Sequence, residues 1–449
     1  MPTALIILAA GQGTRMLSDT PKVLHRLAGA PLLVHAMEAG RALEAARTVV
    51  VAGHGGAAVA DAARAHDPEA ITVTQEEQLG TGHAVAQAMP TLSGFAGDAV
   101  VLFGDTPFIR PETLAAMREA RQAGHDVVVL GFEAAEPGRY GRLVMDGDRL
   151  AHIVEAKDAT DEERAIKFCN SGVICASAET LSTLVGAIGN DNAAGEYYLT
   201  DIVGLANARG LSCTAIRCDE AETLGVNTRA DLARAEAVFQ DRARTEAMAG
   251  GVTLTAPETV FFAHDTVIGR DTVIGPNVIF GPGVTVESGA EIRGFCHLEG
   301  CHVSHGATVG PFARLRPGAE LANDVHVGNF VEVKNAVIDD GAKVNHLTYI
   351  GDAHVGARSN IGAGTITCNY DGVMKHRTEI GADAFIGSST MLVAPVNIGA
   401  RAMTGSGSVI TEDVPDGALA IARGKQSNKP GLGIRLIERL RAIKARKTN

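Results

Sequence analysis

Beyond residue 251, aliphatic side chains recur at every sixth position with occasional one-residue slips, and no other feature of the sequence restricts the fold so strongly. The series comprises Ile268, Ile274, Phe280, Val286, Ile292, Leu298, Val303, Val309, Leu315, Leu321, Val327, Val333, Ile338, Val344, Ile350, Ile380, Ile386, Leu392, Ile398, Thr404 and Ile410. A period of six with an inward aliphatic residue is typical of a parallel β-helix of hexapeptide repeats, whose triangular turns stack through backbone ladders. The 52 glycines and the aromatic content of 4% suit a coil made of many tight corners.

The repeat is interrupted between Ile361 and Ile380. The intervening sequence includes residues 365–372, Thr-Ile-Thr-Cys-Asn-Tyr-Asp-Gly, which we interpret as a loop that leaves the coil. A solenoid does not need such a loop for its structure, so the loop indicates a role in function or assembly.

The first half of the chain follows a different pattern, in which short β-branched runs alternate with helical segments up to about residue 228. The runs lie at 5–9, 49–52, 100–103, 127–131 and 173–176. They predict a Rossmann-like α/β domain with a mainly parallel sheet and helices on both faces. Ligands bind at the carboxyl ends of the strands in such sheets. The apolar run 4–10 could be mistaken for part of a signal peptide. No positive residue lies between the starting Met and this run, so the run predicts a buried strand and not a signal peptide.

The boundaries follow from these patterns. We predict a nucleotide-binding domain over 1–228, a linker helix over 229–250 that ends at Gly250-Gly251, and a repeat domain over 251–449. The tail after Pro430 has apolar residues on one helical face and basic residues between them in sequence, which favours a short docked helix with a solvated basic side. Contact of this basic side with an anionic ligand is the alternative. The apolar residues are Leu436, Ile437, Leu440 and Ile443.

Charge and cysteine content exclude several classes of function. The formal net charge is -12, which disfavours nucleic acid as a partner, while small anionic ligands can still bind at local sites. The seven cysteines include no C-x-x-C pair, so neither a zinc site nor a disulfide framework is expected. No segment has the length of a membrane span, and the chain is expected to be cytoplasmic without a membrane partner.

Residues 8–16, Leu-Ala-Ala-Gly-Gln-Gly-Thr-Arg-Met, directly follow the first predicted strand. Gly11 and Gly13 allow consecutive backbone N–H groups to surround phosphate oxygens. Arg15 and the later Lys22 supply positive charge where a pentavalent phosphorus would form. A lone G-x-G is usually only a tight turn, but the added Thr-Arg-Met and Pro-Lys favour a phosphate site.

These motifs resemble the sugar 1-phosphate nucleotidyltransferase family, as do Gln75 with 78–82, Phe103-Gly104-Asp105, 140–142 and 225–227. The resemblance implies that Arg15 and Lys22 are catalytic and that Asp105 and Asn227 hold Mg²⁺. Taken alone, Asp105 and Asn227 would each be interpreted as a helix cap. The implied contacts to UTP and the nucleotide sugar are Leu8, Ala9, Ala10, Gly11, Lys22, Gln75, Gly80, Thr81, Phe103, Gly104, Asp105, Gly141, Glu155, Asn170 and Asn227.

His346 is the candidate general base of the repeat domain, because imidazole titrates closest to neutral pH. By residue type alone it would be an ordinary surface histidine. Its neighbours in sequence change this interpretation. Segments 314–318, 332–334, 346–349, 360–364 and 369–372 occur in an order that closely resembles the bifunctional family of N-acetylglucosamine 1-phosphate uridyltransferases and glucosamine 1-phosphate acetyltransferases. The match covers nearly the whole chain.

The resemblance implies that acetyl passes from acetyl-CoA to glucosamine 1-phosphate, and that UMP from UTP then joins the product to give UDP-N-acetylglucosamine. Arg316 and Lys334 would hold the sugar phosphate, Tyr349 and Asn360 would orient the sugar, and His346 would accept the proton. The family forms left-handed β-helices and homotrimers with acetyltransferase sites between neighbouring prisms. Gln12 and Ser406 depart from the common family pattern. The implied acetyl-CoA contacts are Ala363, Asn369, Tyr370, Ser388, Ser406 and Arg423.

Two alternatives remain open from sequence. One is a nucleotidyltransferase with a single activity, whose repeat domain serves assembly or allosteric control. The other is a regulatory scaffold that retains the nucleotide-binding fold without turnover, although the presence of Arg15, Lys22, Asp105 and Asn227 counts against it.

Overall fold

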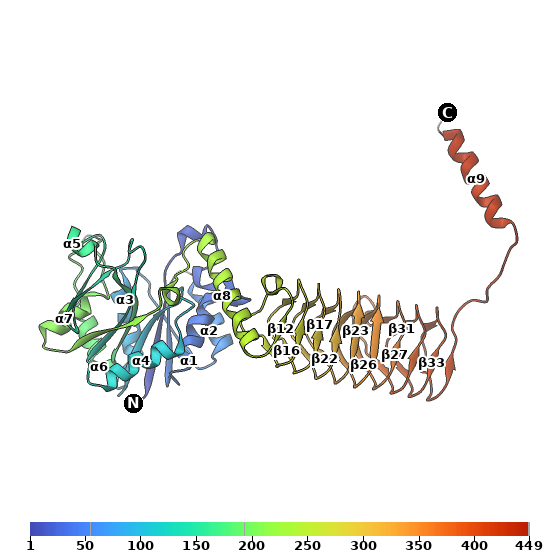
Figure 1. The fold of residues 1–449 in the computed structure, drawn as a ribbon, viewed down its shortest axis with the longest axis horizontal. Coiled ribbons are helices and arrows are strands. Elements are labelled where there is room, and N and C mark those ends of the chain that lie inside the picture. The colour runs from blue at the N-terminus through green and yellow to red at the C-terminus, as the bar shows by residue number, and fades with distance from the viewer. Residues whose placement is uncertain (54, 193, 448–449) are drawn as a thin grey trace. The chain divides into compact units, whose positions relative to one another are not determined.

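The N-terminal half contains a sheet with the main strand order β11-β7-β10-β6-β1-β4-β5 in the computed structural model, which describes residues 1–53, 55–192 and 194–447 (Figure 1). Neighbouring strands are parallel except at β10, which is antiparallel to β6 and β7. The mainly parallel sheet predicted from sequence is therefore confirmed. The strands of this half are β1 (Thr3–Ala9), β2 (Arg26–Leu27), β3 (Ala30–Pro31), β4 (Arg47–Ala52), β5 (Ile71–Thr74), β6 (Asp98–Phe103), β7 (Val127–Glu133), β8 (Arg142–Asp146), β9 (Arg149–Val154), β10 (Phe168–Ser177) and β11 (Cys213–Cys218).

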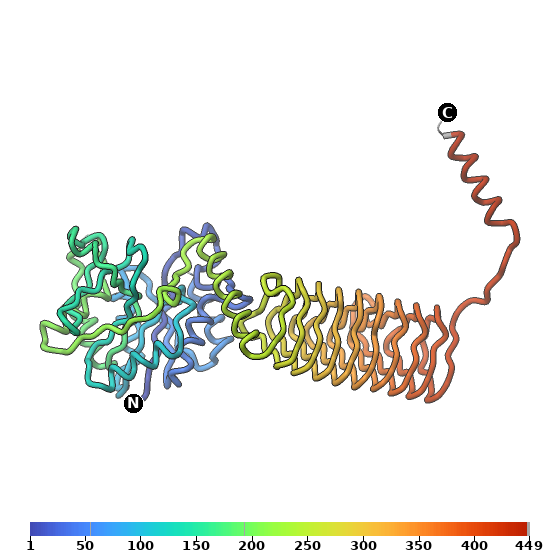
Figure 2. Tube along the Cα trace, in the orientation of Figure 1, coloured from blue at the N-terminus to red at the C-terminus, as the bar shows by residue number. Residues whose placement is uncertain are grey.

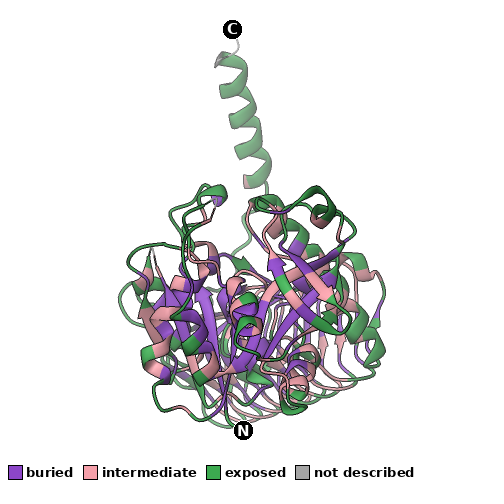
Figure 3. Ribbon diagram, turned by 90° about the vertical axis from the view of Figure 1, so that its left-hand side faces the viewer, coloured by how far each residue is buried: buried purple, intermediate pink, exposed green. Residues whose placement is uncertain are grey.

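Helices cover both faces of this sheet, as predicted, because successive side chains of a buried strand point to opposite faces. Ile6 and Leu8 of β1 pack in one core with α3, α6 and α7, whereas Ile7 and Ala9 pack in a second core with α1, α2 and α4. Figure 3 shows the buried strands between the helices. The helices are α1 (Leu32–Arg41), α2 (Gly56–His66), α3 (Thr81–Ala88), α4 (Pro111–Gln122), α5 (Asp161–Arg164), α6 (Ala178–Val185), α7 (Asp201–Ala208) and α8 (Arg229–Ala249).

The chain divides into two compact units, Met1–Ala243 and Arg244–Asn449. The division falls inside α8, which ends before Gly250 and Gly251, and Gly251 has a φ of 91°. A glycine with positive φ is the usual end of a helix, since other residues are strained there.

The second unit is a three-walled prism of short parallel strands, whose coils can be followed in Figure 2. The first wall comprises β12 (Thr253–Leu254), β14 (Val273–Ile274), β17 (Glu291–Ile292), β20 (Thr308–Val309), β23 (His326–Asn329), β25 (Lys343–His346), β27 (Asn360–Ile361), β30 (Phe385–Ile386), β33 (Met403–Thr404) and β35 (Leu419–Ala420).

The other two walls share β24 (Glu332–Ile338) and β26 (Tyr349–Val355), which continue around a corner of the prism. We call the wall that contains β21 and the first residues of β24 and β26 the second wall. Besides β24 and β26, these two walls contain β13 (Val267–Ile268), β15 (Ile279–Phe280), β16 (Thr285–Val286), β18 (His297–Leu298), β19 (Cys301–Val303), β21 (Arg314–Leu315), β22 (Ala319–Leu321), β28 (Ile366–Cys368), β29 (Thr378–Ile380), β31 (Met391–Val393), β32 (Val396–Ile398) and β34 (Val409–Ile410).

The predicted inward positions are buried, which confirms the six-residue repeat. Leu298, Leu315 and Ile350 are each 0% exposed, and Thr404 and Ile410 at the far end are 3% exposed. Ile268 in the first turns is only partly buried. Because every coil stacks on the next, the inward side chains form one continuous core along the prism.

The predicted loop at 365–372 begins later than the sequence indicated. Residues 366–368 form β28, which pairs with β26 and β31, so the segment outside the prism starts at Asn369. Thr367 is 0% exposed and takes the inward position six residues after Ile361. Its hydroxyl donates to Gly351 O at 3.1 Å and accepts from Gly351 N at 2.8 Å. These bonds satisfy a polar side chain in the core, which the aliphatic pattern could not anticipate.

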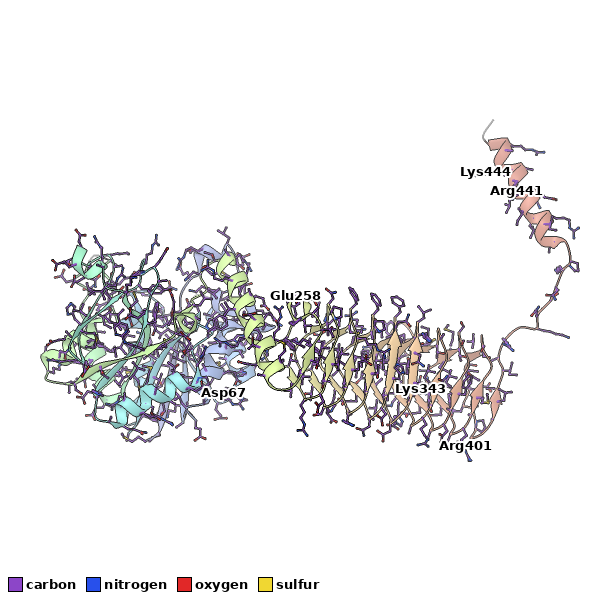
Figure 4. The ribbon with its side chains drawn as sticks, in the orientation of Figure 1. Asp67, Glu258, Lys343, Arg401, Arg441 and Lys444 are labelled. Carbon is purple, nitrogen blue, oxygen red and sulfur yellow. The ribbon has the colours of Figure 1, made fainter. Side chains whose placement is uncertain are left out.

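The C-terminal tail forms α9 (Leu432–Lys447), as predicted, and Arg441 is labelled on it in Figure 4. The expectation that α9 docks was wrong for this chain, because Leu436, Ile437 and Leu440 are 50%, 53% and 64% exposed. An amphipathic helix is stabilised mainly by burying its apolar face, and the described residues of this chain do not cover it. No helix in the described part of the chain is long and apolar enough to cross a membrane.

Replacing Leu298 by Ala should lower the free energy of unfolding of the prism by about 2–5 kcal/mol, because it opens a cavity in the continuous core. Urea unfolding followed by circular dichroism measures this loss. Leu419→Ala is the matched control, since Leu419 is 61% exposed. Equal stability of the two variants would contradict the assigned core.

Candidate functional site

A cavity of about 330 Å³ lies at the carboxyl ends of β1 and β6 in the first unit. At Gly13 the φ angle is 61°, and a Cβ there would lie 2.5 Å from Lys22 Cβ. Glycine therefore allows the loop after β1 to pack against Lys22, at the start of a short 3-10 helix. The cavity is lined by Leu8, Ala9, Ala10, Gly11, Lys22, Val23, Gln75, Gln78, Gly80, Thr81, Ala84, Phe103, Asp105 and Glu196.

Four predicted residues from three parts of the sequence form a hydrogen-bonded group, of which Lys22 and Asp105 line this cavity. Lys22 Nζ hydrogen-bonds the Asp105 carboxylate and donates to Asn227 Oδ1 at 3.1 Å. Arg15 Nη2 donates to the same Asn227 oxygen at 2.9 Å. The backbone explains how Asn227 reaches this place, since Val226 N donates to Asp105 O at 2.9 Å. All four residues that the sequence singled out for phosphate and metal chemistry are thus in contact.

The donor set fits a magnesium ion. Asp105 and Asn227 both present side-chain oxygens to a single cationic atom, Lys22 Nζ. Mg²⁺ prefers oxygen ligands and usually retains several waters, so two protein oxygens suffice beside a polyphosphate. In the described ranges, no group of three or more His, Cys, Asp or Glu side chains is arranged to hold a metal.

The other predicted contacts of the first unit form two groups of residues. Gly141, Glu155 and Asn170 converge, because a Cβ on Gly141 would lie 3.5 Å from Glu155 Oε1 and 3.6 Å from Asn170 Cβ. Burial raises the pKa of Glu155, and a hydrogen bond from the Thr200 hydroxyl at 3.1 Å acts in the opposite direction. Gln75, Gly80 and Thr81 line the same cavity as Asp105, and Gln75 follows β5, which β4 and β1 separate from β6.

In the prism, the predicted base and three predicted acetyl-CoA residues lie in one column along the corner between the first and second walls. We call this column the His346 edge. Backbone bonds connect its levels: Leu347 N donates to Asn329 O, Gly364 N to His346 O, Ser389 N to Ala363 O, and Gly407 N to Ser388 O, at 3.1, 3.1, 2.7 and 2.8 Å. Arg423 Nη1 then donates to Ser406 O at 2.5 Å.

His346 has a defined partner on this edge. Its Nδ1 lies 2.8 Å from Asn329 Oδ1. Because an amide oxygen only accepts, Nδ1 carries the proton and Nε2 keeps its lone pair. His346 is exposed, so this lone pair is accessible to a substrate. Sequence reasoning missed Asn329, although its position one coil before His346 is the signal that could have identified it.

The second wall carries the predicted phosphate-binding residues beside the His346 edge. Arg316, Lys334 and Tyr349 lie on successive levels, since β21 pairs with β24 and β24 with β26. Arg316 donates to Glu332 at 2.8 Å. Tyr349 begins the second wall three residues after His346, and Asn360 lies on the first wall, so the edge is flanked by both predicted sugar-orienting residues.

A buried carboxylate organises the far side of the second wall. Asp352 is 8% exposed and accepts from Lys334 at 3.1 Å and from Asn335 at 2.6 Å. Asn369 donates to it as well, which fixes the start of the loop outside the prism. Burial alone would raise the pKa of Asp352, but these donors outweigh burial and lower it. The sequence analysis did not select Asp352.

Lys375 is a second residue that sequence reasoning missed. The neighbouring Lys334 ammonium lowers the pKa of Lys375. Neighbouring positive charges disfavour each other, so an anion placed between them is stabilised. Tyr370 in the same loop is 60% exposed, and its backbone forms an isolated antiparallel bridge with Lys375.

Comparison with known proteins agrees with both units. Residues 5–173 match the MobA-like NTP transferase domain, and residues 265–300 match the bacterial transferase hexapeptide with six repeats. The bifunctional protein GlmU of Cereibacter sphaeroides is 71% identical over 444 residues, which cover 99% of this chain and 98% of that protein. The bifunctional protein GlmU of Jannaschia sp. is 66% identical, with coverages of 100% and 98%. A solved UDP-glucose pyrophosphorylase in complex with UDP-glucose has 16% identity and a TM-score of 0.44, with coverages of 54% and 100%.

The chain belongs to the GlmU family. The family resemblance inferred from the motifs is thereby confirmed over both units. GlmU proteins are bifunctional by name, and this member presents two separate groups of polar residues, one in each unit. Lys22, Asp105 and Asn227 form the first group, whereas the second group follows the His346 edge and the second wall of the prism.

Thr200→Val should raise the pKa of Glu155 further, because the variant loses a hydrogen bond that favours the ionised carboxylate. Infrared difference titration, with Glu155→Gln to identify the carboxyl band, measures the shift. Thr200→Ser retains the hydroxyl and should leave the pKa near that of the wild type. An unchanged pKa in Thr200→Val would contradict the assigned bond.

Proposed function

We propose that this GlmU protein acetylates glucosamine 1-phosphate with acetyl-CoA in its prism, and then joins the product to UMP from UTP in its first unit. The products are UDP-N-acetylglucosamine and pyrophosphate. The observation that carries the proposal is the presence of two separate groups of predicted site residues, one in each unit, in a chain that matches bifunctional relatives over nearly its whole length. Location in the cytoplasm, where both co-substrates are made, is part of the proposal.

Acetyl transfer follows from the geometry of the His346 edge. The amine of the sugar attacks the thioester carbon, a C–N bond forms and the C–S bond breaks. His346 Nε2 accepts the proton that the amine loses, and the coenzyme thiol leaves. Asn329 keeps the ring in the tautomer that can accept this proton. Arg316 and Lys334 bind the phosphate group, and the acetyl-CoA chain lies along Ala363, Ser388 and Ser406.

Uridylyl transfer needs no general base in the first unit. The attacking oxygen of N-acetylglucosamine 1-phosphate is already anionic near neutral pH, so positioning and charge neutralisation carry the step. A new P–O bond forms to the α-phosphorus of UTP, and pyrophosphate leaves. Arg15 and Lys22 compensate the negative charge that develops. Bound Mg²⁺, held by Asp105 and Asn227, would supply further charge neutralisation.

The two activities should be separable by mutation. His346→Ala should abolish acetylation and leave uridylyl transfer intact, whereas Asp105→Ala should do the reverse. Thiol release from acetyl-CoA and pyrophosphate release from UTP measure the two reactions. Loss of both activities in either folded variant would contradict two independent sites, and absence of thiol release in the wild type would favour the nucleotidyltransferase with a single activity.

A homotrimer is part of the proposal, and three exposed apolar features support it. One is the uncovered face of α9, and another is Val373 in the loop outside the prism, which is 87% exposed. The third is a ladder on the His346 edge, where Phe312 stacks on Phe295 at 4.9 Å and on Phe330 at 5.3 Å. These rings are 46–55% exposed, and a neighbouring prism would bury them.

The wild type should sediment at about 140 kDa, three times the 46.5 kDa of one chain. Phe312→Glu should shift it towards the monomer and lower acetylation more than uridylyl transfer, because it places a charge in the ladder beside the acetyltransferase site. Val267→Glu, at an exposed position in the first turns, is the control. Analytical ultracentrifugation decides the matter, and a monomeric wild type would contradict the trimer.

A further inference from the structure

We propose that His83 is a positioning residue for uridine recognition, because it fixes the orientation of the Gln75 side-chain amide and thereby selects uracil over cytosine. This inference rests on the proposed uridylyl transfer and names the group that sets its base specificity. His83 lies in the first turn of α3, two residues after Thr81, which lines the cavity.

Gln75 is the polar side chain best placed to recognise a base in this cavity. It follows β5 directly, lines the cavity and is only 4% exposed. Asp105 follows β6 and Gln75 follows β5, and β1 and β4 lie between these two strands in the sheet. The base of a nucleotide whose phosphates lie at Lys22 and Asp105 therefore extends towards Gln75 and Gly80. A nearly buried amide has few hydrogen-bond partners within reach. Its orientation decides whether it presents its oxygen or its NH₂ group to a base.

Two neighbours determine which end of the Gln75 amide faces the protein. Gln75 Nε2 lies 3.1 Å from Gly80 O and 3.0 Å from His83 Nδ1. A carbonyl oxygen only accepts, and a neutral ring with an unprotonated Nδ1 also accepts, so both amide hydrogens are used. Oε1 then remains as the acceptor directed away from these two partners. Among the described residues, no hydrogen bond to this oxygen is recorded.

The tautomer of His83 follows from its contact with Gln75. Gln75 Nε2 also donates to Gly80 O, so the Gln75 amide presents its NH₂ group to the ring and His83 Nδ1 accepts from it. His83 Nε2 then carries the proton. Gln87 Nε2, one helical turn later, lies 3.0 Å from His83 Nε2 and 3.3 Å from His83 O, so in this tautomer the Gln87 amide has to turn its oxygen towards the ring. The Tyr197 ring lies 6.3 Å from the imidazole.

The outward oxygen gives the site its selectivity. Uracil carries N3–H, which donates to Gln75 Oε1, whereas N3 of cytosine has no proton and would face a second acceptor. The wrong base would lose a hydrogen bond and leave a buried acceptor unpaired. A site built in this way discriminates strongly between related ligands. Without His83, one amide hydrogen of Gln75 has no partner and only the bond to Gly80 O holds the orientation, so the rotated amide that presents its NH₂ group to the base becomes easier to reach.

The test compares UTP and CTP as nucleotide donors in full-length wild type, His83→Leu and His83→Asn. We expect His83→Leu to raise KM for UTP and to lower the UTP:CTP ratio of kcat/KM, each by about tenfold, which corresponds to one hydrogen bond. The kcat with UTP should change little. His83→Asn should restore both values, because Asn Oδ1 occupies the place of Nδ1 and accepts from Gln75.

The outcomes separate this inference from the proposed function. A wild type that releases no pyrophosphate from UTP contradicts the proposed function itself. An active, folded His83→Leu whose UTP:CTP ratio lies within twofold of the wild type overturns the role of His83, as does a His83→Asn that behaves like His83→Leu. If His83→Leu does not fold, a crystal structure of the wild type with UTP decides: the Gln75 amide must contact both uracil N3 and His83 Nδ1, and a base that does not reach Gln75 overturns the inference.

Discussion

The parallel backbone ladder between successive coils is the constraint on which the prism depends. Each coil contributes its inward side chain to a single continuous core, so outward residues one coil apart are stacked directly above one another. His346, Ala363, Ser388 and Ser406 become one column for this reason, although successive members are 17–25 residues apart in the sequence. A repeating scaffold therefore arranges a long, linear site of the kind that an extended coenzyme needs, without any one element having to bend.

The first unit assembles its proposed site from loops and not from a stacked column. Its substrate is compact and highly charged, and the residues proposed to bind it follow the ends of several strands. Lys22, Asp105 and Asn227 converge because the loop after β6 binds the backbone beside Asn227 through Val226. Ionic side chains at such a junction stabilise one another before substrate binds, so phosphate or a divalent cation would find its proposed partners already in place.

Hydrogen-bond direction is a common feature of the two sites. Asn329 determines which nitrogen of His346 carries the proton, and His83 determines which end of the Gln75 amide faces outwards. In both cases the residue proposed to contact substrate has a neighbour that does not react and that sets its tautomer or orientation. Such neighbours restrict a polar group to one role, which an isolated side chain on a surface would not have.

The sequence by itself determined the two folds, because hydrophobic periodicity is a local property that reports burial directly. It also supplied the family and most candidate residues, since the motifs are contiguous. Asn329, Asp352, Lys375 and His83 were decided only by the tertiary structure, because each acts through a partner on another coil or element. Thr367 shows the limit of the pattern: its inward position required a hydroxyl satisfied by Gly351, and only stacking of neighbouring coils provides that backbone partner. The exposed face of α9 is a further case, since periodicity predicts an apolar face but not the surface that covers it.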